Sequence, residues 1–302
     1  MTRKFDNVLI VLVFVPTEAH LKCVLDIVSG CAGYPTIYVG WCAKAAYWSQ
    51  IEREIFTASA ANPPLFVMKQ AENVGKAMLM NLAVSKLLNQ KIECTYLTFC
   101  DSDLKISKAS AAQLVDIMRE IPPHKQGLVA CNQNVEATNH AMMDDDPVMI
   151  LPSGQRLCVP KIVSAVAGGC FIIPLARWRE VGPLPAVAVY YNEDTILNMR
   201  LEALDAGLIV GIAQELTLEH HSVQHAEFMR WKLAKCVEDN FFTRVGDDVL
   251  MGADQCVIHL KIPASADAAA HYKNAAHANP PTYAERHQAS MRDVKTFWEN
   301  AQ

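Results

Sequence analysis

Two aspartates separated by one residue, Asp101 and Asp103, are the side chains of this sequence best placed to bind a metal ion. They follow the apolar run of residues 94–100, which predicts a strand, so both carboxylates come at its carboxyl end. Open α/β sheets bind ligands at that edge. Two carboxylates there can hold Mn²⁺ or Mg²⁺ and leave positions for diphosphate oxygens. The cation neutralises the negative charge that grows when a diphosphate leaves.

An Asp-x-Asp triplet is common by chance, and the alternative is a pair of aspartates that only cap the strand end. The acidic group at residues 144–146 shows this, because its polar surroundings indicate a solvated turn. Manganese also accepts imidazole beside carboxylates. His220 and His221 end a short apolar run, so either can complete the metal site, and we prefer His220. Adjacent histidines on the surface are the alternative.

Three further groups can bind or activate substrates. Asn73, Gly75 and Lys76 open a helix, where a bare backbone and an ammonium group favour phosphate, although such helix entries are common. Gly168 and Gly169 precede a strand and leave room for a sugar against their amides, unless they form a simple bulge.

The last of these groups opens a later helix. Asp194 follows Asn192 and Glu193 at the start of that helix. It can take a proton from an acceptor hydroxyl. Capping free helix amides is the structural alternative.

The elements that position these residues alternate between apolar strands and helical patterns, which predicts an α/β fold with a mostly parallel central sheet. Residues 7–15 are apolar on both faces, as a central strand should be. Pro16 ends this strand, and Thr17 can cap the helix that follows. Further strands are expected at residues 36–42, 65–69, 95–100 and 127–132, and further helices at 75–88, 109–121 and 194–206. Residues 135–155 lack periodicity and are expected to form a long loop or hairpin that acts as a mobile lid.

Composition excludes several classes of protein. The net charge of −5 provides no global positive field for nucleic acid or anionic membranes. The strongest apolar run, residues 8–15, is too short to span a membrane, and the start of the chain has no signal-peptide pattern. The 10 cysteines form no Cys-x-x-Cys pair and sit mostly in apolar segments, so buried free thiols in a cytoplasmic protein are expected.

Taken in chain order, these groups resemble the motifs of GT-A glycosyltransferases of family 2. That family has an Asn-x-Gly-x-x-x-x-x-Asn helix start, a strand ending in Asp-x-Asp, a Gly-Gly strand followed by Trp and Val-Gly, a Glu-Asp helix start and a late His. The matching residues are Asn73, Gly75, Asn81, Asp101, Asp103, Gly168, Gly169, Trp178, Val181, Gly182, Glu193, Asp194, and His220 or His221. The match covers about residues 7–222.

The resemblance implies a role for each residue. Asp103 is the main metal ligand, Asp101 touches metal or ribose, and Asp194 is the base if the reaction inverts the anomeric centre. Gly168, Gly169 and Glu193 contact substrate. The donor-binding residues are Pro16, Glu18, Trp41, Asn73, Gly75, Lys76 and Ser102. The family usually has an acidic residue after the second strand to read the base; here Trp41 stands there and can stack on it, with a UDP-sugar still the expected donor.

These observations predict a metal-dependent glycosyltransferase with a catalytic domain at residues 1–222 and a mainly helical extension at 223–302. The nucleotide-sugar half is expected at about residues 1–103 and the acceptor half at 104–222. The acceptor stays open between a saccharide, a protein, a metabolite and a modified nucleic-acid base. One alternative is a nucleotidyltransferase, which would carry a glycine-rich basic loop after the first strand. Another is a non-catalytic relative, which would have lost the metal ligands or the base.

Overall fold

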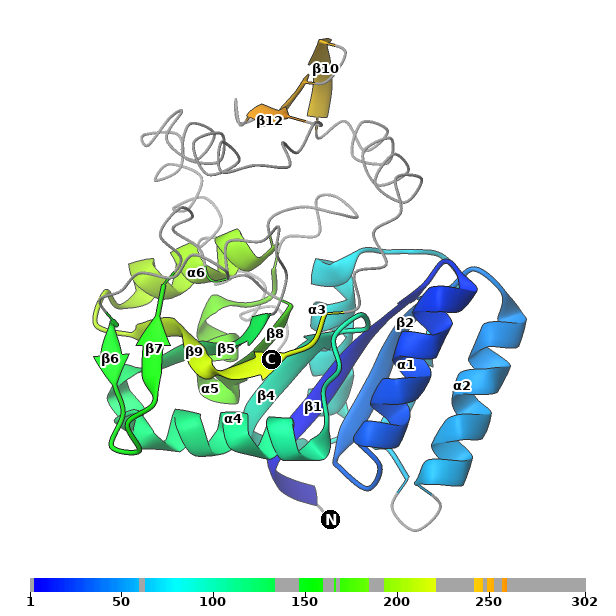
Figure 1. Ribbon diagram of the computed structural model, residues 1–302, viewed down its shortest axis with the longest axis horizontal. Helices are drawn as coiled ribbons and strands as arrows, with labels where there is room; N and C mark the ends of the chain where they lie inside the picture. Colours follow the sequence, from blue (N-terminus) through cyan, green and yellow to red (C-terminus); the bar gives the residue numbers. More distant parts are fainter. Residues whose placement is uncertain are drawn as a thin grey trace.

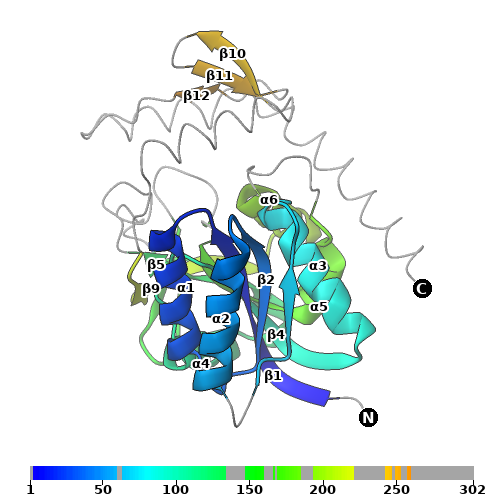
Figure 2. The same ribbon diagram turned by 90° about the vertical axis from the view of Figure 1, so that its right-hand side faces the viewer.

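The computed structural model describes residues 3–59, 63–133, 147–159, 166, 169–184, 193–220, 242–246, 249–252 and 257–259. Its main body is a nine-stranded sheet with the order β3-β2-β1-β4-β8-β5-β9-β7-β6. Helices cover both faces of this sheet (Figures 1 and 2). The strands of the sheet are β1 Arg3–Val15, β2 Thr36–Cys42, β3 Phe66–Lys69, β4 Ile92–Asp101, β5 Gln126–Gln133, β6 Met149–Ile150, β7 Arg156–Cys158, β8 Cys170–Pro174 and β9 Ile209–Leu218. The helices are α1 Glu18–Gly30, α2 Ala45–Ala58, α3 Lys76–Asn89, α4 Lys108–Glu120, the 3₁₀ turn η1 Pro123–Lys125, α5 Leu175–Val181 and α6 Glu193–Leu204.

Strand β1 is buried on both faces, as its uninterrupted apolar sequence predicts. Leu9, Val11 and Val13 pack into one core with α1, α2 and α4. The alternate residues, Ile10 among them, pack into a second core with α3, α5 and α6. Because side chains of a strand alternate between its two faces, one apolar run supplies both cores. Figure 2 shows these two helical layers on opposite sides of the sheet.

The strand order of the sheet reverses beside β1. Strands β3, β2, β1 and β4 are parallel, and the chain passes from β1 to β2 on one side and later to β4 on the other. The carboxyl ends of β1 and β4 therefore flank a point where the strand order reverses, the usual ligand position in such sheets. Strand β8 runs antiparallel to both β4 and β5, so the sheet beyond β4 is mixed.

Most of the expected elements are present, with ends shifted by a few residues. The sequence does not predict the helices α2 and α5, and β9 begins at Ile209, well before the short apolar run that leads to His220. The described part of the expected lid, from residue 147, forms a hairpin of β6 and β7. Residues 135–146, with the acidic group at 144–146, lie outside the described residues.

The described residues after position 222 form a small antiparallel sheet. Its strands are β10 Phe242–Gly246, β11 Val249–Gly252 and β12 Val257–His259. The mainly helical extension that the sequence predicts falls otherwise outside the described residues. Within the described part of the chain, no helix combines the length and the apolar character that a membrane span requires.

Three fully buried cysteines lie side by side under the carboxyl edge of the sheet. They are Cys100 on β4, Cys170 on β8 and Cys131 on β5, and Cys100 is directly opposite Cys170 in the strand register. The cysteines that the structure describes are free thiols, and all but Cys94 are buried. This agrees with the buried thiols expected from the sequence, and we call these three residues the thiol cluster.

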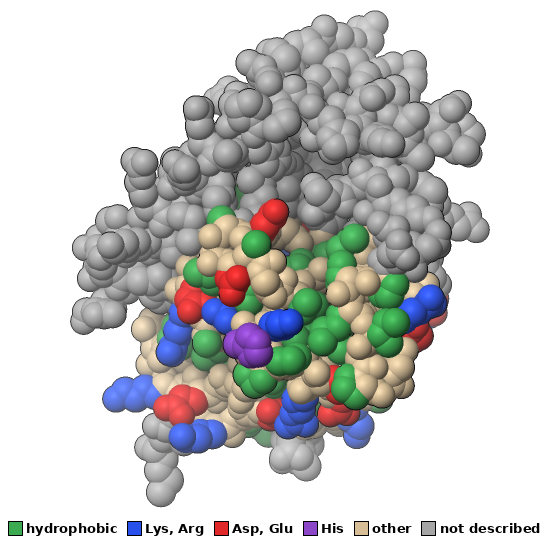
Figure 3. Space-filling view, turned by 90° about the vertical axis from the view of Figure 1, so that its left-hand side faces the viewer, with side chains coloured by type: hydrophobic (Ala, Val, Ile, Leu, Met, Phe, Trp, Pro, Cys, Tyr) green, Lys and Arg blue, Asp and Glu red, His purple; other side chains and the backbone are tan. Residues whose placement is uncertain are grey.

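The outer edge of the sheet at β6 is short and lies in mixed surroundings. Val148 and Ile150 are 45% and 63% exposed there. Figure 3 shows this side of the molecule, where hydrophobic side chains and charges of both signs are interspersed. A two-residue edge strand with charged neighbours offers little template for pairing with another chain. The described part of this face also carries no broad positive area suited to nucleic acid.

Gly40 allows β2 to approach β1 closely, just before both strands end. A Cβ atom at residue 40 would lie 2.6 Å from the carbonyl carbon of Val13, a backbone atom that no rotamer change can move away. We expect Gly40→Ala to lower the free energy of unfolding by about 2 kcal/mol or more, as overpacking does. Urea unfolding checks this, with Gly207→Ala as the control, because the new Cβ there meets only the flexible Asp205 side chain. Equal stability of the two variants would contradict the prediction.

Candidate active site

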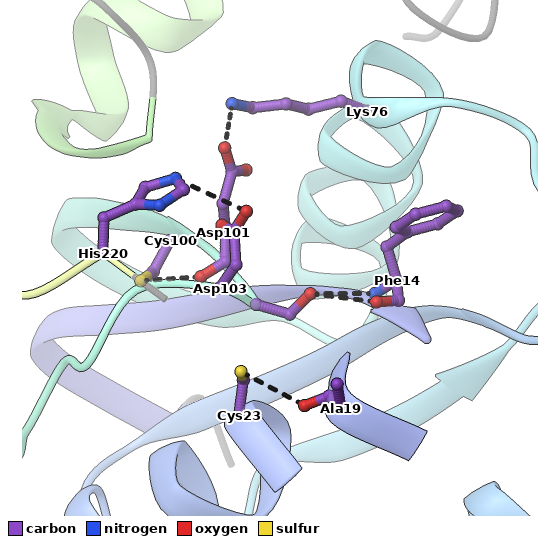
Figure 4. A network of polar contacts seen from close by, with 9 residues as sticks. Phe14, Ala19, Cys23, Lys76, Cys100, Asp101, Asp103 and His220 are labelled. Atoms are coloured by element: carbon purple, nitrogen blue, oxygen red, sulfur yellow. Dashed lines mark hydrogen bonds and ion pairs between the residues drawn. The ribbon is translucent and has the colours of Figure 1, made fainter. Parts of the chain in front are cut away.

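The candidate site lies where β1 and β4 end and where α3 and α6 begin. Figure 4 shows the side chains of Lys76, Asp101, Asp103 and His220 converging there. Each comes from a separate segment of the chain: the start of α3, the end of β4, the turn after it, and the segment that follows β9. The parallel strands bring these segments to one edge of the sheet, as the position of the aspartates in the sequence predicts.

Lys76 joins carboxylates from the two parts of the site. Its ammonium nitrogen lies 2.8 Å from Oδ2 of Asp101 and 3.4 Å from Oε1 of Glu193, the first residue of α6. All three side chains are largely shielded, with exposed fractions of 18%, 30% and 17% for Lys76, Asp101 and Glu193. Lys76 therefore already neutralises part of the negative charge of these carboxylates, and a bound cation would neutralise more of it.

Burial and charge shift the pKa values of this pair. Burial raises the pKa of Asp101 above its usual range, the Asp103 and Glu193 carboxylates add to the rise, and Lys76 opposes it. Burial alone would lower the pKa of Lys76, but the Asp101 and Glu193 carboxylates together raise it well above its usual value. Lys76 is thus a permanent cation at neutral pH.

Asp103 faces His220 because two loops pair with each other. Leu104 and His220 form an isolated antiparallel bridge, and the backbone N–H of Lys105 donates to the carbonyl oxygen of Glu219 at 2.9 Å. This pairing places Nε2 of His220 3.4 Å from Oδ2 of Asp103. The structure therefore brings His220, the preferred histidine, to the aspartates. His221 lies outside the described residues.

Ser102, between the two aspartates, fixes the turn to β1. Its hydroxyl accepts from the backbone N–H of Phe14 at 3.1 Å and donates to the carbonyl oxygen of Phe14 at 3.3 Å. The side chain is almost fully buried. The hydroxyl of Ser102 therefore holds the end of β1 against the aspartate turn, and the donor-binding role expected for Ser102 stays a prediction.

Gly169 is packed more tightly than its expected sugar-binding role requires. Its carbonyl oxygen accepts from the backbone N–H of Asp101 at 2.7 Å. A Cβ atom at this position would overlap the side-chain amide of Gln133 and lie 3.0 Å from Leu104 Cδ1. The space expected for a ligand is thus filled by Gln133 and Leu104. Gly168 lies outside the described residues.

The start of α3 is built as the sequence predicts. Oδ1 of Asn73 accepts from the backbone N–H of Gly75 at 3.1 Å, which shapes the turn before the helix. Gly75 has a φ of 80°, a conformation that favours glycine. No acidic residue lies in the first turn of α3, so its free amides and Lys76 form a positive end.

Hydrogen bonds from Asn81 and Arg200 hold the backbone of residues 181–184, which lead from the end of α5 toward α6. Both amide atoms of Asn81 bond the backbone of Leu184, at 2.7 and 2.9 Å. Nη1 of Arg200 donates to the carbonyl oxygens of Val181 and Pro183, each at 2.6 Å. Arg200 is only 1% exposed, and no pattern in the sequence marks it for this role.

Asp194 lies in the first turn of α6, next to Glu193. Its backbone carbonyl oxygen accepts from Nδ2 of Asn198 at 2.7 Å, which secures the helix start. Its carboxylate is close enough to Lys76 to raise the pKa of that ammonium group, after the effects of Asp101 and Glu193. The candidate base thus belongs to the same charged group as the aspartate turn. Asn192 lies outside the described residues.

The end of β1 carries the remaining donor-binding candidates. Pro16 ends the strand, and Glu18 is exposed on the first turn of α1. Thr17 is at the helix cap position, but its hydroxyl bonds Nδ1 of His20 at 2.8 Å instead of a backbone amide. Trp41 stacks on Phe14, a partner that the sequence did not indicate.

The donor atoms present fit a divalent cation in their chemistry. Asp101, Asp103 and His220 provide two carboxylates and an imidazole, a mixed set that Mn²⁺ accepts. Within the described ranges, however, no three His, Cys, Asp or Glu side chains are already arranged around one point. Asp101 would have to turn from Lys76 toward the cation.

We expect His220→Ala to weaken Mn²⁺ binding by about tenfold, the effect of losing roughly 1.4 kcal/mol of binding free energy. Isothermal titration with MnCl₂ and UDP measures this, and the matched control is His124→Ala on η1. If His220→Ala binds Mn²⁺ with the wild-type affinity, or if the His124→Ala control loses as much affinity, His220 is not a metal ligand.

Comparison with known proteins supports the fold. No protein-family model and no curated protein sequence matches the chain. A mannosyltransferase of Pyrobaculum calidifontis, solved with GDP-Man and Mn²⁺, is similar with a TM-score of 0.53 and 13% identity, over 98% of this chain and 76% of that one. GalNAc-T7, solved with UDP, GalNAc and Mn²⁺, is similar with a TM-score of 0.50 and 10% identity, over 71% of this chain and 43% of that one.

TarS 1–349 of S. aureus has a TM-score of 0.49 and 15% identity, over 77% of this chain and 66% of that one, which is too weak a likeness to support a shared fold. The chain thus spans less than two thirds of the length of TarS 1–349 and of GalNAc-T7. The mannosyltransferase and GalNAc-T7 together show that the chain has a GT-A-like fold, as the resemblance in its sequence implies.

Proposed function

We propose that the chain is a glycosyltransferase that moves a sugar from a nucleoside diphosphate-sugar to a hydroxyl acceptor, with inversion. The observation that carries this proposal is the convergence of Lys76, Asp101, Asp103, His220 and the start of α6 at the carboxyl edge of the sheet. A diphosphate needs cations at such an edge, and an acceptor hydroxyl needs a base.

Each residue has a distinct part in the proposed reaction. Asp101, Asp103 and His220 would hold Mn²⁺ or Mg²⁺, and the bound cation would neutralise the negative charge of the departing diphosphate. Lys76 and the amides at the start of α3 bind phosphate oxygens of the donor. Asp194 takes the proton of the acceptor hydroxyl as that oxygen attacks the anomeric carbon from the side opposite the diphosphate.

The two fold neighbours with sufficient similarity support this class of ligand. One was solved with GDP-Man and Mn²⁺, and the other with UDP, GalNAc and Mn²⁺. The sequence resemblance implies a UDP-sugar, and the chain carries carboxylates, a histidine and Asp194 at the positions where the resemblance places metal ligands and a base. A non-catalytic relative would have lost them.

A ligand screen followed by a turnover assay tests the proposal. Thermal shift with nucleoside diphosphate-sugars, with and without MnCl₂, is expected to show stabilisation only when both are present. Release of the nucleoside diphosphate from the best donor then reports transfer or slow hydrolysis. Full activity in excess chelator would exclude the metal role. Pyrophosphate release from a nucleoside triphosphate and a sugar phosphate would show a nucleotidyltransferase instead.

A further inference from the structure

An aromatic pair stands at the end of the first two strands, beside the proposed donor site. Phe14 on β1 and Trp41 on β2 are directly opposite in the parallel register. Their ring centroids are 5.7 Å apart and their planes are inclined by 27°, so the rings are stacked. Both side chains are partly exposed. Two stacked rings at the ligand edge of an α/β sheet form a surface on which another flat ring can lie.

The pair is held at a fixed position relative to the aspartate turn. Ser102 bonds the backbone N–H and carbonyl oxygen of Phe14 with one hydroxyl. The strand order β2-β1-β4 then places Trp41 on the far side of Phe14 from the aspartates. A nucleotide whose diphosphate lies at the aspartate turn therefore extends its base toward the ends of β1 and β2.

The surroundings of the pair keep it rigid. Gly40 packs its bare Cα against the backbone of Val13, which fixes the backbone that carries Trp41. The ring of His20 meets Phe14 edge to face at 6.0 Å, and Thr17 anchors that imidazole through Nδ1. A surface that is ordered before binding loses little conformational entropy when a ligand arrives.

The chemistry at this position recognises the face of a base better than its edge. Selective binding of uracil requires an acceptor for its N3–H group, and a carboxylate is the strongest acceptor that a side chain offers. The residues that follow the aromatic pair along β1 and β2 are Val15, Pro16, Cys42, Ala43 and Lys44, and none of them carries a carboxylate. Stacking, in contrast, tolerates every base because each one has a π-face.

We propose that Trp41, backed by Phe14, is the residue that binds the base of the donor, and that the site accepts purine and pyrimidine nucleoside diphosphates alike. Purines bind at least as tightly as uracil, because they offer a larger ring surface for stacking. This inference rests on the proposed function. The sequence resemblance implies specificity for uridine. Our proposal is instead that affinity increases with the area of the base that stacks on Trp41.

Titration of nucleoside diphosphates tests the proposal. In the presence of MnCl₂, the wild-type protein should bind GDP and ADP at least as tightly as UDP and CDP. Trp41→Ala should weaken all four by roughly 5- to 150-fold, the equivalent of the 1–3 kcal/mol of one base–aromatic stack. Trp41→Phe should retain most of the affinity. Inorganic pyrophosphate, which has no base, should bind the wild-type protein and Trp41→Ala equally.

A second variant distinguishes hydrogen bonding to the edge of the base from stacking on its face. Glu18, exposed on the first turn of α1, is the acidic residue closest in sequence to Phe14 that could reach a base edge. Because Glu18 is itself a donor-binding candidate, Glu18→Gln can weaken the binding of both nucleotides, but it should change UDP and GDP by the same factor, so that the ratio of their affinities stays at the wild-type value. The proposal is overturned if UDP binds tenfold more tightly than GDP and ADP, if Glu18→Gln abolishes a preference for UDP, or if Trp41→Ala binds all four like the wild type. An equal loss of pyrophosphate binding in Trp41→Ala would also overturn it. If pyrophosphate and all nucleoside diphosphates fail to bind, the proposed function itself is wrong.

Discussion

Turnover of the donor is expected to fall by about three orders of magnitude or more in Asp103→Ala, while the protein stays folded. The proposed cation stabilises the departing diphosphate by several kcal/mol, and each 1.4 kcal/mol corresponds to about a factor of ten in rate. Asp103 is 32% exposed and its side chain contacts His220, so its removal leaves the packing of β4 intact. Steady-state turnover at saturating MnCl₂ and urea unfolding measure the two effects.

The matched control for this variant is Asp116→Ala. Asp116 lies on α4, is 71% exposed and pairs only loosely with Arg119 at 3.4 Å. Its loss should alter neither turnover nor metal affinity. If Asp103→Ala keeps the wild-type turnover, or if the Asp116→Ala control loses as much turnover, Asp103 has no part in the reaction.

The second large effect is expected at Asp194. Asn keeps the size and the capping ability of Asp at a helix start but has no basicity, so Asp194→Asn should fold and bind donor normally. Its turnover should fall by roughly two to four orders of magnitude, the range of general-base contributions. Pre-steady-state and steady-state release of the nucleoside diphosphate, with water as the acceptor, report the chemical step separately from donor binding.

Two outcomes would exclude Asp194 as the base. One is turnover close to that of the wild type, which would reduce the residue to a helix cap. The other is a product that retains the anomeric configuration, since an inverting base has no place in that reaction. Glu202→Gln, an exposed change on the same helix, controls for general effects of removing a negative charge from α6.

The sequence predicts the parts of this site that depend on strand ends and helix starts. Asp101 and Asp103 follow an apolar strand, and Lys76 follows a glycine at a helix start, so local patterns alone place them at one edge of the sheet. His220 is close to them because the segment after β9 pairs with Leu104. The sequence indicated a strand end there, but it did not indicate its partner.

What the sequence could not predict depends on contacts between distant side chains. The Ser102 hydroxyl meets the backbone of Phe14 across 88 residues of sequence, and nothing near Ser102 signals that use. The glycine pair predicts open space at Gly169, but the side chain of Gln133 on β5 fills that space. The short helix α5 gives too few turns for a clear periodicity, so it was missed.

The thiol cluster makes it possible to measure how often the ligand edge of the sheet opens. Burial raises the pKa of Cys100 and Cys131 and keeps both thiols out of reach of reagents while β4, β8 and β5 remain paired. Alkylation of these cysteines, followed by mass spectrometry of their peptides, therefore counts the transient separations of these strands. Cys100 directly precedes Asp101, so a ligand that immobilises the aspartate turn would lower the rate of Cys100 alkylation. This test of ligand binding does not depend on an assay of turnover.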